Sequence, residues 1–356
     1  MAVYTTIDDS SQYFQTTLYS GNSGSNAVTF SGNSDMQPDI VWIKCTSNGS
    51  TNGYAWDSSR GVTKYIPISS ANAESADAAS LTAFGSDGFT MGDGGAEMNN
   101  SGRTYISWAW KVNGGTRVTN TESGDNPGGG YQVNTTSGIS ILDYTGTGGA
   151  GTKTHGLGVV PRAIFVHDRG GNNHAVYMDN QISSDPETDY YRLDTTLAGT
   201  DDSGRWNDTA PTSSVITLGS NNEVNGDDRT YVAWVFKDIQ GFSKFGTYVG
   251  NGLSNGPFVS CGFKPALVVC KRHDATDNWG MHTTVNATNS GANPIDKFLA
   301  ANSDSSNMDA DMDLISNGFK IRTTNSTFNS DDGTYFYMAF AEHPMVSSDG
   351  VPCTAR

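Results

Sequence analysis

Bulky hydrophobic residues alternate with smaller ones in three short segments of the chain, each beginning with Thr-Tyr. In residues 104–110 the bulky positions are Ile106, Trp108 and Trp110, and residues 230–236 and 334–340 repeat the pattern. A period of two is typical of a β-strand that buries one face. The pattern therefore predicts three equivalent strands, each with one buried face.

A second shared feature is a continuous apolar run that starts at a proline and ends beside a cation, at residues 38–44, 161–167 and 265–271. The markers recur in order: prolines Pro38, Pro161 and Pro265, asparagines Asn99, Asn225 and Asn329, and tyrosines Tyr105, Tyr231 and Tyr335. The spacing from proline to tyrosine is nearly the same in the three copies, and the asparagine keeps a constant distance before the tyrosine. Short apolar runs suit central strands, and a proline is tolerated at a strand start.

This recurrence indicates one module used three times. Short apolar runs separated by Gly, Asn, Asp and Ser are typical of a sandwich or barrel. We therefore predict an all-β protein of three tandem antiparallel β-sandwiches, at 14–115, 140–240 and 241–345. The remaining segments are predicted as an N-terminal arm (1–13), a glycine-rich linker or surface loop (116–139) and a C-terminal tail (346–356). Residues 73–84 alone have a composition that suits a turn or two of helix.

Charge and cysteine content narrow the classes of function. The 356-residue chain has a formal net charge of −16 and only 21 Lys and Arg residues, which argues against nucleic acid as the main partner. Its four cysteines, Cys45, Cys261, Cys270 and Cys353, form no Cys-x-x-Cys pair, so no zinc signature is present. We expect them to be small buried hydrophobes, and whether they ever pair is open. With no signal peptide and no apolar run of about 20 residues, we expect cytoplasmic synthesis without membrane insertion.

Two positions in the repeat carry residue types that could act in catalysis or ligand binding. The cation after each apolar run is Lys44, His167 or Lys271, and this change of residue type favours a polar strand end over a catalytic group. An aromatic residue also follows each marker proline at a similar distance along the chain: Trp56, Tyr177 and Trp279. Such rings could stack on sugars, but their recurrence favours the sandwich cores. Trp279 and the nearby His282 are kept as candidate ligand-binding residues.

The clearest metal-like pattern is Asp309, Asp311 and Asp313, because alternating carboxylates in a loop suit Ca²⁺. The EF-hand pattern is incomplete, so a solvated acidic loop is the main interpretation and Ca²⁺ the alternative. The glycine-rich residues 146–151 resemble a nucleotide loop, but no helix or Gly-Lys-Ser/Thr follows, so we expect a turn. No nucleophile and base stand out, although the many carboxylates leave a glycosidase open. We expect no enzyme activity and no cofactor.

Several phrases resemble a family of tailed-bacteriophage virion proteins of marine, cyanophage type. They lie at residues 4–15, 38–44, 56–64 and 105–111, and in the second repeat at residues 144–148, 155–158 and 161. The resemblance implies lectin-like jelly-roll repeats of the concanavalin or SPRY type. It also implies a tail fibre, with residues 1–13 anchored to the particle and the third repeat distal.

The resulting functional expectation is a non-enzymatic virion protein on the phage tail that attaches the particle to a bacterial surface. Expected partners are other virion proteins, a surface glycan or protein receptor, and further copies of the chain, with a trimer favoured. A capsid decoration protein and a polysaccharide-degrading tailspike are the alternatives. The sequence leaves the receptor, the oligomer and the attachment point open.

Overall fold

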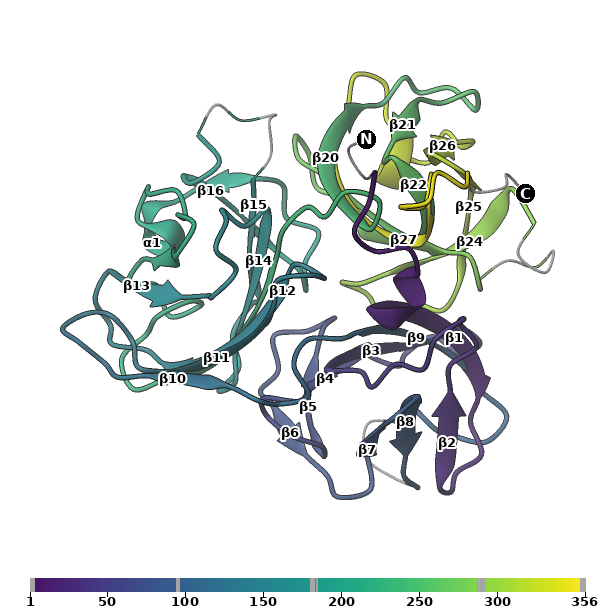
Figure 1. Ribbon diagram of the computed structural model, residues 1–356. Helices are drawn as coiled ribbons and strands as arrows, with labels where there is room; N and C mark the ends of the chain where they lie inside the picture. The colour runs from purple at the N-terminus through teal and green to yellow at the C-terminus, as the bar shows by residue number, and fades with distance from the viewer. Residues whose placement is uncertain are drawn as a thin grey trace.

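Figure 1 shows a computed structural model of the chain, in which residues 4–93, 97–179, 183, 185–286, 288 and 292–352 are described. Nearly all of its regular structure is antiparallel β-sheet, so the all-β prediction is confirmed. The helices are short: η1 (Ser10–Gln12), α1 (Ser203–Trp206) and α2 (Ser326–Asn329). None of the described helices is long and apolar enough to span a bilayer.

The first repeat, 14–115, contains two sheets. The six-stranded sheet has the order β1 (Phe14–Ser20), β9 (Thr104–Trp110), β3 (Ile40–Cys45), β4 (Tyr54–Asp57), β5 (Lys64–Pro67) and β6 (Ser75–Ala76). The three-stranded sheet has the order β2 (Asn26–Thr29), β8 (Gly88–Met91) and β7 (Leu81–Gly85). The helical turn expected at 73–84 is therefore wrong, since β6 and β7 occupy that segment.

The second repeat, 140–240, shares its large sheet with the segment before it. The order is β10 (Val118–Asn120), β11 (Gly129–Asn134), β12 (Ile139–Thr145), β19 (Thr230–Phe236), β14 (Ala163–Asp168), β15 (Ala175–Met178), β16 (Asp189–Arg192) and β17 (Thr200–Asp201). A small sheet pairs β13 (Gly151–Thr154) with β18 (Val215–Leu218). The predicted linker at 116–139 is thus wrong in part, because β10 and β11 extend the sheet.

The third repeat, 241–345, forms one eight-stranded sheet. The order is β20 (Ser243–Val249), β27 (Thr334–Pro344), β22 (Phe263–Arg272), β23 (Trp279–Thr283), β24 (Ile295–Ala300), β25 (Met308–Ile315), β26 (Gly318–Ile321) and β21 (Phe258–Ser260). Pro265 lies inside β22, where the register shifts against β27. A bulge accommodates a proline within a strand, so only Pro38 and Pro161 precede their strands as predicted.

The same four-strand order occurs three times: β1-β9-β3-β4, β12-β19-β14-β15 and β20-β27-β22-β23. The register is also shared, because the fourth residue after each proline pairs with the third after each tyrosine. These pairs are Trp42 with Trp108, Phe165 with Trp234, and Val269 with Met338. The sequence repeat is therefore a structural repeat.

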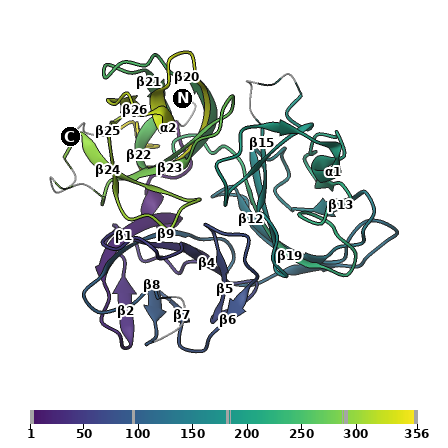
Figure 2. The same cartoon turned by 180° about the vertical axis from the view of Figure 1, so that it is seen from behind.

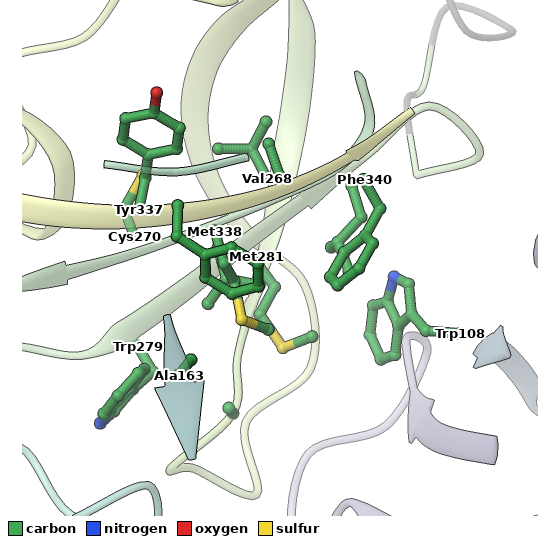
Figure 3. Packing of buried hydrophobic residues seen from close by; sticks show 14 of the residues in the cluster. Trp108, Ala163, Val268, Cys270, Trp279, Met281, Tyr337, Met338 and Phe340 are labelled. Carbon is green, nitrogen blue, oxygen red and sulfur yellow. The ribbon is translucent and has the colours of Figure 1, made fainter. Parts of the chain in front are cut away.

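The three repeats are arranged around a common centre and not in a row (Figures 1 and 2). Trp110, Phe236 and Phe340 occupy the same position in the three repeats, and their rings contact one another at centroid distances of 5.5 to 6.3 Å. One hydrophobic cluster contains residues of all three repeats, and Figure 3 shows part of it, with Trp108, Ala163 and Phe340 contributed by the first, second and third repeats. The repeats follow one another along the chain, but their strands pack around this shared centre.

Both faces of the tyrosine strands are buried, and not one face as expected. In β9 the bulky residues face the shared centre, whereas Tyr105 and Ala109 belong to a separate core inside the first repeat. Tyr231 and Ala233 in β19 likewise belong to a core inside the second repeat. The alternation therefore separates two buried faces, one packed against the other repeats and one within its own repeat.

The N-terminal residues 4–13 pack on the third repeat. The Tyr4 hydroxyl donates to the Gly262 carbonyl oxygen of the third repeat at 2.6 Å, and the Thr5 hydroxyl donates at 3.0 Å to the carbonyl oxygen of Gln240, the residue just before that repeat. Ile7 is buried in the shared hydrophobic cluster. This segment ties the start of the chain to its last repeat, so the described part of the arm does not extend away from the body.

Candidate functional site

The marker tyrosines hold a turn of their own repeat. The Tyr231 hydroxyl donates to the Asn222 carbonyl oxygen and accepts from the Gly226 N–H, both at 2.7 Å. Tyr105 and Tyr335 make the corresponding pairs of hydrogen bonds. A tyrosine that bonds back to the backbone a few residues upstream is a known device for fastening the corner of a β-sandwich. These residues therefore serve the scaffold.

The marker asparagines lie on the turn that the tyrosine holds, and each binds a second turn of the same repeat. Asn329 Oδ1 accepts from the Asn251 N–H at 2.8 Å, and its Nδ2 donates to the carbonyl oxygens of Leu253 and Thr323 at 2.7 and 2.8 Å. Asn99 and Asn225 bind the equivalent turns. All three are buried, which makes their amide groups costly to leave unpaired.

The glycine-rich segment 146–151 is one of these asparagine-bound turns. Asn225 Nδ2 donates to the Gly149 carbonyl oxygen at 2.6 Å, and a Cβ on Gly146 would lie 2.3 Å from the Gly226 carbonyl oxygen. The glycine is needed because two turns touch here. The prediction of a turn in place of a nucleotide loop agrees with this geometry.

The cation positions lie at junctions between repeats. Lys44 of the first repeat is fully buried, and its Nζ donates to the Ser303 carbonyl oxygen in the third. Lys271 of the third repeat donates to the Thr196 carbonyl oxygen in the second at 3.1 Å. Loss of hydration on burial lowers the pKa of each lysine to about 8.

His167, at the same position in the second repeat, faces the first. Its ring lies 4.3 Å from that of Trp234 and 4.5 Å from that of His174, whose Nε2 bonds to the Pro67 carbonyl oxygen at 2.7 Å. Neither ring nitrogen of His167 has a hydrogen-bond partner among the described residues, and burial lowers its pKa well below the ordinary value. The three cation positions are thus polar residues near strand ends, as expected, and they are buried rather than facing solvent. All three side chains are buried because the neighbouring repeat covers the strand end.

An ion-pair cluster joins the first and second repeats beside His167. Arg60 donates to Asp57 at 2.7 Å, and Glu74 pairs with Arg60 at 3.1 Å and with Arg169 of the second repeat at 2.8 Å. Nε1 of Trp234 also donates to Asp57 at 3.3 Å. Glu74 is shared between the buried Arg60 and the partly exposed Arg169, and two cations balance two carboxylates, so this junction is polar but internally neutralised.

The candidate ligand residues Trp279 and His282 are both fully buried, so their proposed contact with a ligand is wrong for this structure. Trp279 Nε1 donates to the Arg192 carbonyl oxygen at 2.9 Å, which ties the third repeat to the second. His282 Nε2 bonds to the Ala310 carbonyl oxygen at 2.8 Å. Trp56 and Tyr177 lie in the cores of their repeats, as predicted. A recurring aromatic residue can indicate either a core position or a sugar-binding surface, and the burial of these rings favours the core.

The acidic candidates Asp309, Asp311 and Asp313 lie on strand β25 and not in a loop. They alternate with buried residues and share one face, where successive Cα atoms are about 7 Å apart. Asp309 pairs with Lys297 on the neighbouring strand, and Asp313 lies 3.7 Å from Arg322. Among the described residues no group of three or more His, Cys, Asp or Glu side chains is placed to hold a metal ion.

Three of the cysteines are free and buried: Cys45, Cys261 and Cys270. This agrees with their predicted role as small hydrophobes. Burial raises the pKa of the Cys270 thiol to about 12, which leaves little reactive thiolate. Cys353 lies outside the described residues.

A groove of about 610 Å³ lies between the first and third repeats. One wall comes from strand β1 and the loop after β2, and the other from the third repeat. Its lining residues are Ser11, Phe14, Gln15, Thr16, Leu18, Ser31, Gly32, Asn33, Ala266, Thr284, Val285, Thr288, Ala341, Glu342 and His343. Most are small, uncharged polar or apolar residues. No sequence pattern pointed to this groove, because its two walls come from opposite ends of the chain.

A family model described as a domain of unknown function, DUF7483, matches residues 9–344. The chain belongs to the DUF7483 family. A search of curated proteins found no match, and a search of solved structures found none either. The matched region spans all three repeats, so the DUF7483 domain corresponds to the whole three-repeat body and not to a single repeat.

The third repeat of this DUF7483 domain carries a concentration of exposed apolar residues. Val249, Leu253 and Phe258 are 54%, 61% and 46% exposed, and they lie close together in sequence. Asn329 and Asn251 fasten the turn that carries them. Exposed apolar side chains on a fixed turn are typical of a contact surface.

Proposed function

We propose that this DUF7483 protein is a non-enzymatic virion protein, a tail fibre or tail-associated receptor-binding component that attaches a phage to a bacterial surface glycan or protein. The observation that carries the proposal is the set of virion-type phrases at residues 4–15, 38–44, 56–64, 105–111, 144–148, 155–158 and 161. In the structure these phrases include η1, β3, β4 and β9, which belong to the scaffold.

The finer form of the proposal is that each repeat is a jelly-roll-like sandwich. In the first two repeats a large sheet and a small sheet enclose a separate hydrophobic core. In the third, the eight-stranded sheet contains the equivalent strands and contributes to the shared centre. Three such bodies around one centre would give a rigid platform that presents loops on its outside.

The exposed turn at 249–258 is the proposed receptor contact. Its test is binding of the purified full chain to host cells, because a truncated third repeat would expose the shared centre and need not fold. The double variant Leu253→Ser/Phe258→Ser should lose most binding. The matched double variant Val118→Ser/Val160→Ser, at residues that are also exposed, should keep it. Equal binding by both variants would contradict a contact at this turn.

A capsid decoration protein is the second candidate. The observation that favours it is the arm at residues 4–13, which packs on the third repeat and gives a compact body. Particle imaging separates the two roles, since decoration predicts density for this chain across the shell and receptor binding predicts density on the tail. Release of reducing ends from host polysaccharide by the purified protein would instead support a tailspike.

The proposed partners include other copies of the chain, with a trimer favoured. Three repeats within one chain already surround the aromatic centre, so a trimer would use outer surfaces. Sedimentation at equilibrium over a hundredfold range of concentration tests this, and a monomer throughout would contradict the trimer.

A further inference from the structure

Strand β1 is the outermost strand of its sheet, and within the described part of the chain one side of its backbone has no partner strand. The Lys111 N–H donates to the Tyr13 carbonyl oxygen, and the Gly21 N–H donates to the Arg103 carbonyl oxygen. In an antiparallel pair the hydrogen-bonded residues alternate, so odd-numbered residues of β1 face β9. The N–H and C=O groups of Phe14, Thr16 and Leu18 therefore point away from β9, and these three residues line the groove.

The equivalent edge of the second repeat is covered by a strand of the chain itself. Strand β11 pairs antiparallel with β12, and Gln132 lies opposite Ile141, the counterpart of Thr16. The Gln132 side chain donates to the hydroxyls of Ser58 and Ser59 in the first repeat, at 2.8 and 2.7 Å. Strand β11 thus completes the sheet and fills the junction between two repeats.

The equivalent edge of the third repeat is partly closed by a side chain. The outward N–H of Phe245, the counterpart of Thr16 in β20, donates to Asp238 Oδ1 at 2.8 Å. Lys244 Nζ lies 3.2 Å from Asp238 Oδ2. Among the described residues, no strand pairs with the outer edge of β1, and no carboxylate accepts from the outward N–H groups of Thr16 and Leu18.

The groove occupies the place that β11 fills in the second repeat. Its far wall includes Thr284 and Val285, which follow Thr283 just as Ser58 and Ser59 follow Asp57. Thr283 and Asp57 are counterparts, because they pair with Leu267 and Ile40, each two residues after a marker proline. The residues that bind Gln132 at the filled junction therefore have their counterparts in the wall of the open groove.

We propose that the groove beside β1 is a docking site for an extended peptide strand of another protein, which adds antiparallel to β1 as β11 adds to β12. Addition of a strand to a sheet edge gains main-chain hydrogen bonds, while the walls select side chains. The walls are mainly uncharged, and the charge of Glu342 is balanced by Lys264 at 2.6 Å. The strand that fits carries no charged residues, as is true of β11, whose sequence is Gly-Gly-Tyr-Gln-Val-Asn. This inference does not depend on the proposed virion role.

The test uses the full chain and a synthetic peptide with the sequence of residues 128–135, which contains β11. Hydrogen exchange at the Thr16 and Leu18 amides should slow by about tenfold or more at saturating peptide, because those N–H groups would gain carbonyl partners. A peptide with proline in place of Gln132 should give no protection, since proline removes a ladder donor. Absence of protection by the unmodified peptide would overturn the proposal.

Two variants and one competing ligand make the result specific. Leu18→Pro removes an outward N–H and should abolish peptide protection at Thr16, whereas Leu18→Ala keeps the N–H and should preserve it. Thr284→Arg blocks the opposite wall without altering β1 and should also abolish protection. Thermal unfolding of each variant identifies any that fails to fold. If Leu18→Pro fails to fold, the result for Thr284→Arg decides whether the peptide binds in the groove.

Protection of the Thr16 and Leu18 amides by a neutral oligosaccharide such as maltohexaose, and not by the peptide, would overturn the peptide assignment and favour carbohydrate.

Discussion

Trp110 and Phe340 pack with their ring centroids 5.5 Å apart, although they lie in the first and last repeats. Each is the fifth residue after its marker tyrosine. Phe236, at the same position in the second repeat, lies 6.3 Å from Trp110 and 5.8 Å from Phe340. The residues at one repeated sequence position thus contact one another across the three repeats. The three repeats therefore share a centre that none of them contains alone.

The shared centre predicts that the three repeats unfold together. Phe236→Ala should lower the free energy of unfolding by about 3–5 kcal/mol, because it removes a large ring from a centre that cannot readily collapse. Urea unfolding followed by tryptophan fluorescence should show one transition for wild type and variant, at a lower urea concentration for the variant. Val118→Ala, at an exposed site, should change stability by less than about 0.5 kcal/mol. Two transitions, with one unaffected by Phe236→Ala, would show that the repeats fold separately.

The strands that could be predicted are those whose periodicity recurs. The segments 104–110, 230–236 and 334–340 were expected as strands, and β9 and β19 have those bounds while β27 continues to Pro344. The partner of each face could not be predicted, because bulky apolar residues suit burial in a sandwich core and against another repeat equally well. Small residues on the other face, such as Ser107, gave no sign that this face is buried too.

The glycine-rich segment shows why local composition misled. Residues 116–139 were expected to form a linker or surface loop, because they are polar and rich in glycine, which is disfavoured in strands. In β11, however, Gly130 packs against the neighbouring strand β10, and a Cβ there would lie 2.8 Å from the Val118 carbonyl oxygen. Gly129 adopts a φ of +122°, which L side chains rarely adopt. Close packing requires these glycines, and the groove beside β1 is likewise visible only once distant segments meet.

The asparagine-bound turns give a second stability prediction. Asn329→Asp keeps the size of the side chain but replaces its donor with a carboxylate oxygen, which would face the carbonyl oxygens of Leu253 and Thr323. We expect a loss of about 1–3 kcal/mol, the cost of leaving buried polar groups unpaired. Chemical denaturation measures it, with the change Asn33→Asp at an exposed side chain as the control. A loss no larger than that of the control would show that the turn is held by other contacts.

The buried lysines predict that stability rises with pH above neutrality. The pKa of Lys44 is about 8 in the folded protein and 10.5 in the unfolded chain, so the unfolded chain holds more protons between these values. The free energy of unfolding should therefore increase from pH 8 to 9.5, by about 2 kcal/mol for this residue. The rise should stop near pH 10, because burial raises the pKa of tyrosines such as Tyr248 and ionisation then favours the unfolded chain.

Urea denaturation at half-unit intervals of pH measures this rise. Lys44→Met should flatten it without abolishing it, because Lys271 also has a pKa of about 8. Lys244→Met, at a side chain that is 43% exposed, should leave the slope unchanged. A wild-type free energy of unfolding that is constant or falls between pH 8 and 9.5 would contradict the lowered pKa of the buried Lys44.

The buried histidines predict the opposite limit, a loss of stability in weak acid. Burial lowers the pKa of His282 to about 4 from an ordinary value of 6.5, so the unfolded chain takes up a proton first as the pH falls. The free energy of unfolding should decrease by about 3 kcal/mol for this residue between pH 6.5 and 4.

Urea denaturation at several pH values measures the slope of the free energy of unfolding against pH. His282→Asn should reduce this slope but keep part of it, because His167 is buried in the same way. His343→Asn, at a side chain that is 46% exposed, is the matched control and should leave the slope as in wild type. The slope is the readout, since loss of the bond to Ala310 lowers stability at every pH. An unchanged slope in His282→Asn would mean that this histidine does not control acid sensitivity.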